Sequence, residues 1–356
     1  MGATEMSATT KRVLSVIASL ATVLSATAAP VHAQAPATDF YAGKTITLLI
    51  GFGSGGGNDI WARLIARHIG KHLPGRPNVI AQNLPGGGGL LVANQLYNIS
   101  PKDGTVIALI NRGIPMEPLL GGQGTKFDAL KFIYLGSPDR DTPICVSRAD
   151  SGVTTMKQLF SQELIVGATG SGADSAIYPE FMGQLLGMKF KVVKGYKGSN
   201  EVRLAMERGE VQGICGSNDS IMTSDIARSG KISVLFQAAF TPDPRLKDVA
   251  LGGEGARTAE ERRVLELFFM RAALGRPFIA PPGVPDDRVV MLRKAFDAAV
   301  KDPAFNEEAA KQSFTAEPMT GHELTQAVKR AYDMPPAVIK QTADVLGRIT
   351  AAEQKK

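Results

Sequence analysis

The sequence is poor in the side chains that most often carry metal or nucleophile chemistry. Its 356 residues include only two cysteines and four histidines, and no CxxC spacing occurs. Neither a usual zinc site nor a thioredoxin-like redox site is therefore predicted. In an oxidising compartment, Cys145 and Cys215 are compatible with one disulfide or with two buried free thiols.

A concentrated stripe of positive charge is also absent. The chain has 40 basic and 34 acidic residues, a formal net charge of +6, but the two signs are interspersed. No basic run is longer than a pair such as Arg262-Arg263. Nucleic-acid binding is not predicted, because it needs clustered positive charge. The mild basic excess suits small anionic ligands.

The one long run of apolar and small residues lies at the N-terminus. Lys11 and Arg12 precede residues 13–29, which carry no charge, and Val31-His32-Ala33 supplies the small residues of a cleavage site. This pattern predicts a signal peptide over residues 1–33, a mature chain from near Gln34 and a periplasmic location. A retained anchor is the alternative, but the run is shorter than the roughly 20 residues that span a bilayer.

The remaining chain alternates short β-branched runs with helical spacing, which is typical of βαβ units. Helical spacing occurs in residues 59–72, 173–186 and 201–208, and throughout the last part from 286 to about 347. The predicted strands are residues 45–50, 78–82, 105–110, 132–135, 144–147, 164–168, 190–193, 211–215, 232–237 and 276–280.

This order predicts an α/β protein of two lobes with a ligand cleft between them. The helical tail has no sheet of its own and must pack on an earlier lobe. We therefore expect a discontinuous first lobe, residues 34–138 plus 275–356, and a second lobe, residues 139–274. The two crossings between the lobes form a hinge that allows closure on a ligand.

A glycine-rich loop, residues 51–57, leads from the first predicted strand into a helix. Glycines let the backbone approach a ligand, and a helix N-terminus offers free N–H groups to an anion. The loop also contains G-x-G-x-x-G, but the next strand ends in Gln82-Asn83, without the acid that a dinucleotide ribose needs. No Gly-Lys-Ser/Thr follows, so a P-loop is not predicted. An anion site is favoured, and a tight turn without a ligand is the alternative.

A second loop of glycines and hydroxyl residues, residues 169–175, opens another helix after the strand at 164–168. In open α/β sheets, ligands bind at the carboxyl ends of the strands. We expect the two loops, one from each lobe, to face each other across the cleft.

Several segments resemble the tripartite tricarboxylate transporter receptors, often called Bug proteins, in the same order over almost all of the mature chain. They include FYAGKTIT at 40–47, the loop ending at 59, QNLPGGGG at 82–89, SPKDG at 100–104, GYKG at 195–198 and APPGVP at 280–285. The resemblance implies a type II periplasmic binding protein fold that closes on a small carboxylate, with no cofactor and no catalytic residues. Membrane transporter subunits or a sensor are the implied partners, and we expect a monomer.

The sequence departs from the family pattern at three places. Asn83-Leu84-Pro85-Gly86 lacks the usual arginine, whereas Asn111-Arg112-Gly113 adds one where the family has small residues. Ala173-Asp174-Ser175 replaces a serine run followed by histidine. These departures indicate a ligand that differs from the common tricarboxylates and dicarboxylates.

Carried over position by position, the family pattern predicts a ligand site built mainly from backbone donors. Arg112 is its one cationic side chain, able to form a bidentate pair with a carboxylate; a solvated surface arginine is the alternative. Asp174 either caps its own helix or recognises a hydrogen-donating group of the ligand, because two carboxylates would repel each other. Arg112 departs from the family pattern, and Ser217 and Asn218 are included because the carboxyl end of the strand at 211–215 should also reach the cleft. The predicted site residues are Gly53, Ser54, Gly55, Gly56, Gly57, Asn58, Arg112, Thr169, Ser171, Gly172, Ala173, Asp174, Ser217 and Asn218.

Three other patterns have a functional and a structural interpretation. His68 and His72 are four apart, as in a metal pair, but cations at a helix C-terminus are the commoner explanation. Trp61 could stack on a ligand, but its spacing with neighbouring apolar residues favours the core. A secreted hydrolase is the alternative to a receptor, yet Gly170-Ser171-Gly172 is not a nucleophile elbow, and only His322 remains as a base.

Overall fold

The computed structural model describes Gly2 and residues 40–354. Apart from Gly2, the predicted signal peptide (residues 1–33) lies outside the described residues, as does the start of the mature chain near Gln34. Within the described part, no helix combines the length and the apolar character that crossing a bilayer requires.

The first sheet takes strands from two distant parts of the chain. Its order is β11-β4-β10-β3-β1-β2. β1 lies parallel to β2 and β3, whereas β10 is antiparallel to β3 and β4. The strands are β1 (Thr45–Ile50), β2 (Asn78–Asn83), β3 (Val106–Leu109), β4 (Ile133–Ser137), β10 (Phe278–Ala280) and β11 (Met319–Thr320).

The second sheet repeats this plan with different strands. Its order is β7-β6-β8-β5-β9, with β6 parallel to β7 and β8, and β5 antiparallel to β8 and β9. The predicted strand at 211–215 is two residues further along, because the pairing of β8 with β5 sets its register. The strands are β5 (Pro143–Arg148), β6 (Leu164–Ala168), β7 (Phe190–Lys194), β8 (Gly213–Ser217) and β9 (Ile232–Gln237).

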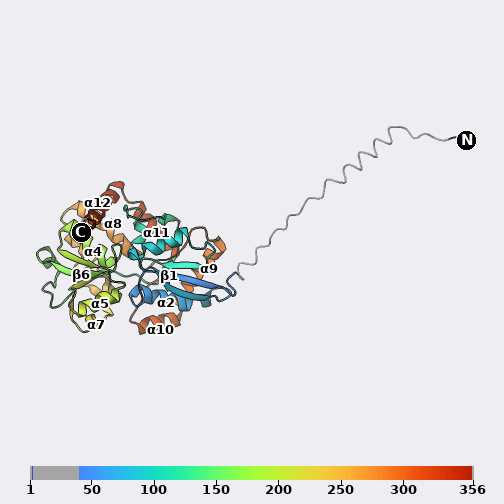
Figure 1. The fold of residues 1–356 in the computed structure, drawn as a ribbon, viewed down its shortest axis with the longest axis horizontal. Coiled ribbons are helices and arrows are strands. Elements are labelled where there is room, and N and C mark those ends of the chain that lie inside the picture. The colour runs from blue at the N-terminus through green and yellow to red at the C-terminus, as the bar shows by residue number, and fades with distance from the viewer. Residues whose placement is uncertain (1, 3–39, 355–356) are drawn as a thin grey trace. The chain divides into compact units, whose positions relative to one another are not determined.

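Helices cover both faces of each sheet (Figure 1). α2, α9 and α10 share one core with the first sheet, and α3 and α11 share the other. α4, α8 and α12 lie on one face of the second sheet, and α5, α6 and α7 lie on the other. The helices are α2 (Gly57–Ile69), α3 (Leu90–Asn98), α4 (Asp174–Leu186), α5 (Ser199–Glu207), α6 (Asn218–Met222), α7 (Asp225–Arg228), α8 (Ala259–Phe269), α9 (Asp286–Lys301), α10 (Pro303–Lys311), α11 (Gly321–Tyr332) and α12 (Pro336–Glu353).

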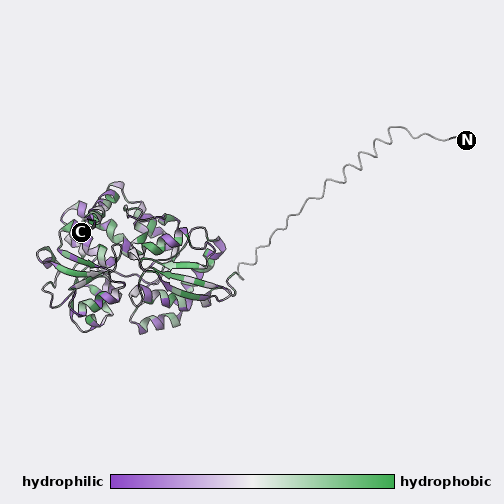
Figure 2. Cartoon of the chain, in the orientation of Figure 1, coloured by the Kyte–Doolittle hydropathy of each residue, from purple (hydrophilic) through white to green (hydrophobic). Residues whose placement is uncertain are grey.

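The period-two pattern of the strands places apolar side chains in both cores. On β1, Ile46, Leu48 and Ile50 contact the core under α2, whereas Leu49 belongs to the core under α3. A strand buried on both faces must be apolar at successive positions, as in a parallel sheet covered by helices. Figure 2 shows this as green strands between helices that carry purple residues.

The chain crosses between the two sheets more than twice. Residues 138–142 connect β4 to β5, and residues 275–277 lead into β10. In addition, α12 contacts α8 and α4, which cover the second sheet, although it follows α11 on the first sheet. Val345 and Ile349 of α12 are buried in the core with those helices. The last helix therefore packs on the sheet of residues 139–274 rather than on the sheet that precedes it.

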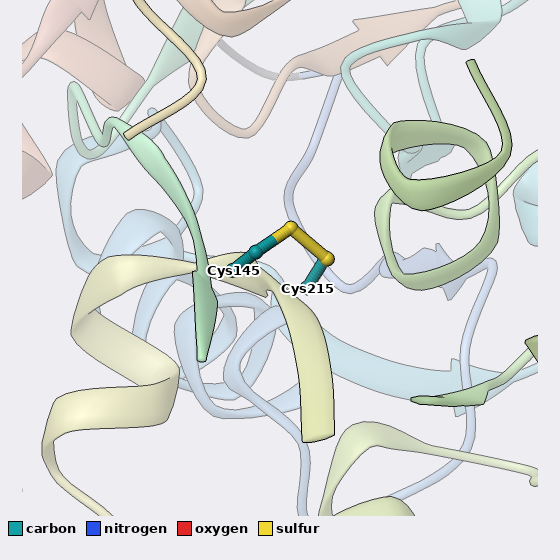
Figure 3. Close-up of a disulfide and its surroundings, with 2 residues drawn as sticks. All are labelled: Cys145 and Cys215. Atoms are coloured by element: carbon teal, nitrogen blue, oxygen red, sulfur yellow. A yellow bond between two sulfur atoms is a disulfide. The ribbon is translucent and has the colours of Figure 1, made fainter. Parts of the chain in front are cut away.

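Cys145 and Cys215 form a disulfide between two neighbouring strands (Figure 3). They lie directly opposite each other in the antiparallel pairing of β5 and β8. Both side chains are buried. The covalent bond therefore joins the strand that enters the second sheet to the strand that carries Ser217.

Replacing both cysteines by alanine should lower the free energy of unfolding by about 2 to 5 kcal/mol, because the bond restricts the unfolded chain across 70 residues. Urea denaturation measures the change. A reducing agent should destabilise the wild type and leave the double variant unchanged. Equal stability of the two proteins without reductant would contradict the prediction.

Candidate functional site

A cavity of about 70 Å³ lies between the two sheets. The segments that line it lie at or just after the carboxyl ends of parallel strands, or belong to the crossing before β10. Ligands bind at this edge in open α/β sheets, where neighbouring connections diverge to opposite faces. The lining residues are Phe52, Gly53, Gly56, Gly57, Asn58, Asn111, Arg112, Thr169, Ala173, Asp174, Ser175, Gly198, Ser199, Ile214, Cys215, Gly216, Ser217, Ser220, Ile221, Gly275 and Arg276.

Four helices begin at this cavity. Their first residues are Gly57 of α2, Asp174 of α4, Ser199 of α5 and Asn218 of α6. At α2, α4 and α5 no side chain caps the N-terminus. These three helix starts carry free backbone N–H groups and a partial positive charge. At α6 the Ser220 N–H donates to Ser217 Oγ and the Asp219 N–H donates to Asp141 Oδ1. The cavity is therefore suited to an anion.

The structure brings most of the predicted site residues to this cavity. Those that line it are Gly53, Gly56, Gly57, Asn58, Arg112, Thr169, Ala173, Asp174 and Ser217. Their role in binding stays a prediction.

Five predicted residues do not line the cavity. Ser54 and Gly55 are exposed, and the Gly55 N–H donates to Asp59 Oδ2 at 2.9 Å. Ser171 and Gly172 line a separate groove beside α12. Asn218 is buried at the start of α6. A glycine loop must turn sharply to enter its helix, so only part of it faces the cavity.

Outside the two glycine loops and the adjoining Asn58, only Arg112 and Ser217 of the cavity residues were predicted from the sequence. Arg276 was assigned to a strand, but β10 begins only at Phe278. The Arg276 N–H donates to Ser137 Oγ at 2.8 Å, and Pro277 has no N–H to give to the sheet. Ser199 and Ser220 lie at starts of helices that the sequence placed imprecisely or not at all.

Backbone contacts join the loops of the two sheets beside the cavity. The Gly53 N–H donates to Lys197 O at 3.1 Å, and a Cβ at position 53 would lie 2.7 Å from that oxygen. A Cβ at position 57 would collide with Ser220 Oγ. Glycine at these two positions therefore allows the loops to approach each other closely.

Arg112 is buried, not a solvated surface arginine, and it pairs with two carboxylates. Its Nη2 lies 3.1 Å from Asp141 Oδ2, and its Nε lies 3.1 Å from Asp174 Oδ2. The three side chains come from the end of β3, the crossing after β4 and the start of α4. Burial alone would lower the pKa of Arg112, but Asp174 and Asp141 together raise it above its ordinary value.

Asp174 does not cap its own helix, so that expectation is wrong. Ala173 is the N-cap of α4 and no side chain caps it. The Asp174 carboxylate instead accepts a hydrogen bond from Asn111 Nδ2 at 3.2 Å and pairs with Arg112. Because the carboxylate oxygens are used in this way, repulsion of a ligand carboxylate is reduced.

Asp219, beside the cavity on α6, has a perturbed acidity. Its backbone N–H donates to Asp141 Oδ1 at 3.2 Å, and its carboxylate pairs with Arg245 at 2.6 Å. Burial and then the nearby Asp141 raise the pKa of Asp219 from 3.8 to about 6. Burial also raises the pKa of Asp141.

This shift predicts a pH dependence of stability. Between pH 3.8 and about 6 the folded protein holds the Asp219 proton and the unfolded chain does not, so stability falls as the pH rises through this window. Asp219→Asn removes this contribution. The free energy of unfolding of the variant, minus that of the wild type, should therefore rise by about 1 kcal/mol from pH 5 to pH 8. Urea denaturation at both pH values measures it, and a pH-independent difference would contradict it.

The alternative sites raised by the sequence have structural explanations. His68 Nε2 contacts Glu308 at 2.8 Å, and His72 Nε2 contacts Asp302 at 3.1 Å, both on or beside α10. Within the described residues, no group of three or more His, Cys, Asp or Glu is arranged to hold a metal. Trp61 is fully buried against Phe305 and Phe314, as the core interpretation predicted.

The two residues that the hydrolase alternative relied on, Ser171 and His322, do not meet at the cavity. His322, the remaining candidate base, is exposed at the start of α11 and does not line the cavity. Ser171 does not line it either. A nucleophile and a base must lie within hydrogen-bond reach of each other.

Comparisons with known proteins agree with these observations. A protein encoded in the gbd 5' region of Cupriavidus necator is 27% identical over 340 residues, which cover 91% of this chain and 94% of that protein. The periplasmic binding protein BugD superposes with a TM-score of 0.67 at 20% identity, over 87% of this chain and 99% of BugD. MatC from Rhodopseudomonas palustris with bound malate gives 0.66 at 19% identity, over 85% and 99%. The two-lobed periplasmic binding protein fold is thus confirmed.

Residues 61–343 match the profile of the family described as the tripartite tricarboxylate transporter family receptor. The match covers most of the chain and includes the second glycine loop, residues 169–175, but it begins just after the first, residues 51–57. The members of this family are receptors and not enzymes. This is consistent with a cavity that is lined by helix N-termini. The resemblance seen in the sequence is confirmed, and the chain belongs to the tripartite tricarboxylate transporter receptor family.

Proposed function

We propose that this protein is a periplasmic receptor that captures a small carboxylate between its two lobes. The observation that carries the proposal is the convergence of α2, α4, α5 and α6 on one cavity. Free N–H groups at helix N-termini hold an anion without a cationic side chain. The related fold of MatC was solved with bound malate, a small carboxylate.

The size of the cavity limits the ligand. The cavity measures about 70 Å³, which exceeds the minimum of about 15 Å³ that one water molecule needs. This volume suits an acid of a few carbon atoms. The buried pairs of Arg112 add no net positive charge, which favours one carboxylate as the main anionic group.

The proposed mechanism is closure of the lobes about their crossings. We infer that residues up to 138 and from 275 onward move against residues 139–274, with α12 moving with the second group because it packs on α8 and α4. The Gly53 N–H to Lys197 O hydrogen bond forms in the closed arrangement. Closure surrounds the ligand with backbone donors from both lobes.

We further propose where the protein acts and with which partners. A signal peptide over residues 1–33 directs the chain to the periplasm, where the disulfide is stable. The family implies membrane transporter subunits as partners, and a sensor is the alternative. We propose that the receptor acts as a monomer.

A thermal-shift screen of acids with two to six carbons tests the function. At about 100 times its dissociation constant, a ligand should add roughly 2.7 kcal/mol of stability. Mass spectrometry of the incubated acid should show no product. No stabilisation by any acid would contradict carboxylate binding, and turnover would contradict the receptor role.

A further inference from the structure

The crossing that leads into β10 places an arginine in the cavity. Arg276 is 2% exposed and lines the cavity next to Gly275. Its backbone N–H is bound to Ser137 Oγ at the end of β4, at 2.8 Å. The backbone from which the side chain extends is therefore held in place by the first sheet.

The guanidinium has only part of its hydrogen-bonding capacity satisfied. Nη2 donates to Ser217 Oγ at 2.5 Å, and Nη1 pairs with the Asp139 carboxylate. Nε has no hydrogen-bond partner among the described residues. A guanidinium has five N–H donors, and a buried donor without an acceptor is unfavourable. An acceptor in the cavity would satisfy these groups.

A second buried guanidinium, that of Arg112, also acts on Arg276. Burial and then Arg112 lower the pKa of Arg276, although a guanidinium remains protonated in proteins. Nη2 lies 3.4 Å from the position that a Cβ on Gly57 would take. An anion bound at the N-terminus of α2 would therefore lie within contact distance of the guanidinium.

We propose that Arg276 binds the ligand carboxylate directly and determines the preference for an acid over its uncharged analogue. This inference rests on the proposed receptor function. The carboxylate lies between the N-terminus of α2 and the start of α6, where Ser217 also contacts the guanidinium. Asp139, on the other crossing, holds the guanidinium toward this point.

The test compares malate and the other acids of the screen with their amides by calorimetric titration. Arg276→Met combined with Asp139→Asn removes both buried charges, so that no carboxylate is left unpaired. The control is Arg140→Met, an exposed arginine on the same crossing as Asp139. In the double variant, affinity for the acid should fall at least 30-fold, while affinity for the amide changes little. The control should keep the preference of the wild type.

The outcomes separate this inference from the proposed function. If no acid binds the wild type, the proposed function fails and this assignment fails with it. If the acid binds and the double variant keeps the acid-to-amide ratio within threefold, only the role of Arg276 is overturned. Equal losses for acid and amide also overturn it, because they indicate a structural role. Should the double variant not fold, Arg276→Lys replaces it, with an expected loss of at least tenfold for the acid alone.

Discussion

Replacing Arg112 by methionine is expected to lower the free energy of unfolding by about 3 to 5 kcal/mol. The change leaves Asp141 and Asp174 buried without their cation, and both lie within 3.1 Å of it in the wild type. An unpaired buried carboxylate is far less stable than a paired one. Chemical denaturation followed by circular dichroism measures the loss.

Two further variants test this explanation. Arg257→Met removes an exposed arginine that pairs with Glu261 and should change stability by less than about 1 kcal/mol. Asp174→Asn, alone and with Arg112→Met, completes a double-mutant cycle. A coupling energy of about 1 to 3 kcal/mol is expected for residues in direct contact. A coupling energy near zero would show that the pair of Arg112 and Asp174 does not stabilise the folded protein.

Replacing Gly57 by alanine is expected to weaken binding of the stabilising acid roughly 10- to 100-fold. The new methyl group would collide with Ser220 Oγ and lie 3.2 Å from Ser220 Cβ across the cavity. Overpacking of this kind costs about 1 to 3 kcal/mol. In the proposed open arrangement of the unliganded protein the two lobes are apart, so we expect its stability to change little. Calorimetry measures the affinity, and small-angle scattering should show less contraction on binding.

The collision can be relieved from the other side. Ser220→Gly combined with Gly57→Ala removes the opposing atoms and should recover most of the affinity. Gly347→Ala is the matched control, because a Cβ at that position in α12 meets nothing within 4 Å. It should leave binding unchanged. If the double variant binds as poorly as Gly57→Ala alone, the contact across the cavity is not the cause.

The helix starts and strands were accessible from local pattern. The limits of β1, β6 and β9 equal the predicted ranges, because short runs rich in apolar and β-branched residues are typical of strands. The glycine-rich loops before α2 and α4 were also recognised, because glycines between a strand and a helix are visible in the local sequence. Short helices such as α6 were missed, because five residues carry too little periodicity.

The charged side chains of the cavity were not predictable in the same way. Arg112 was expected to meet the ligand, yet its partners Asp141 and Asp174 are 29 and 62 residues away along the chain. Arg276 was assigned to a strand because the apolar run after it suggested one. The packing of distant segments decides which charged side chains meet in a buried site. The local spacing of residues does not predict such contacts.

The sequence by itself determined the class of this protein: an α/β chain of two lobes with two glycine-rich helix starts that favour an anion. The spacing of apolar residues and the positions of glycines are local properties, so they can be read directly from the sequence. Only the tertiary structure decided that four helix N-termini share one cavity, that α12 packs on the second sheet, and that Arg276 lies beside Gly57. These are contacts between segments far apart in the chain, and they exist only once both sheets have formed and closed on each other.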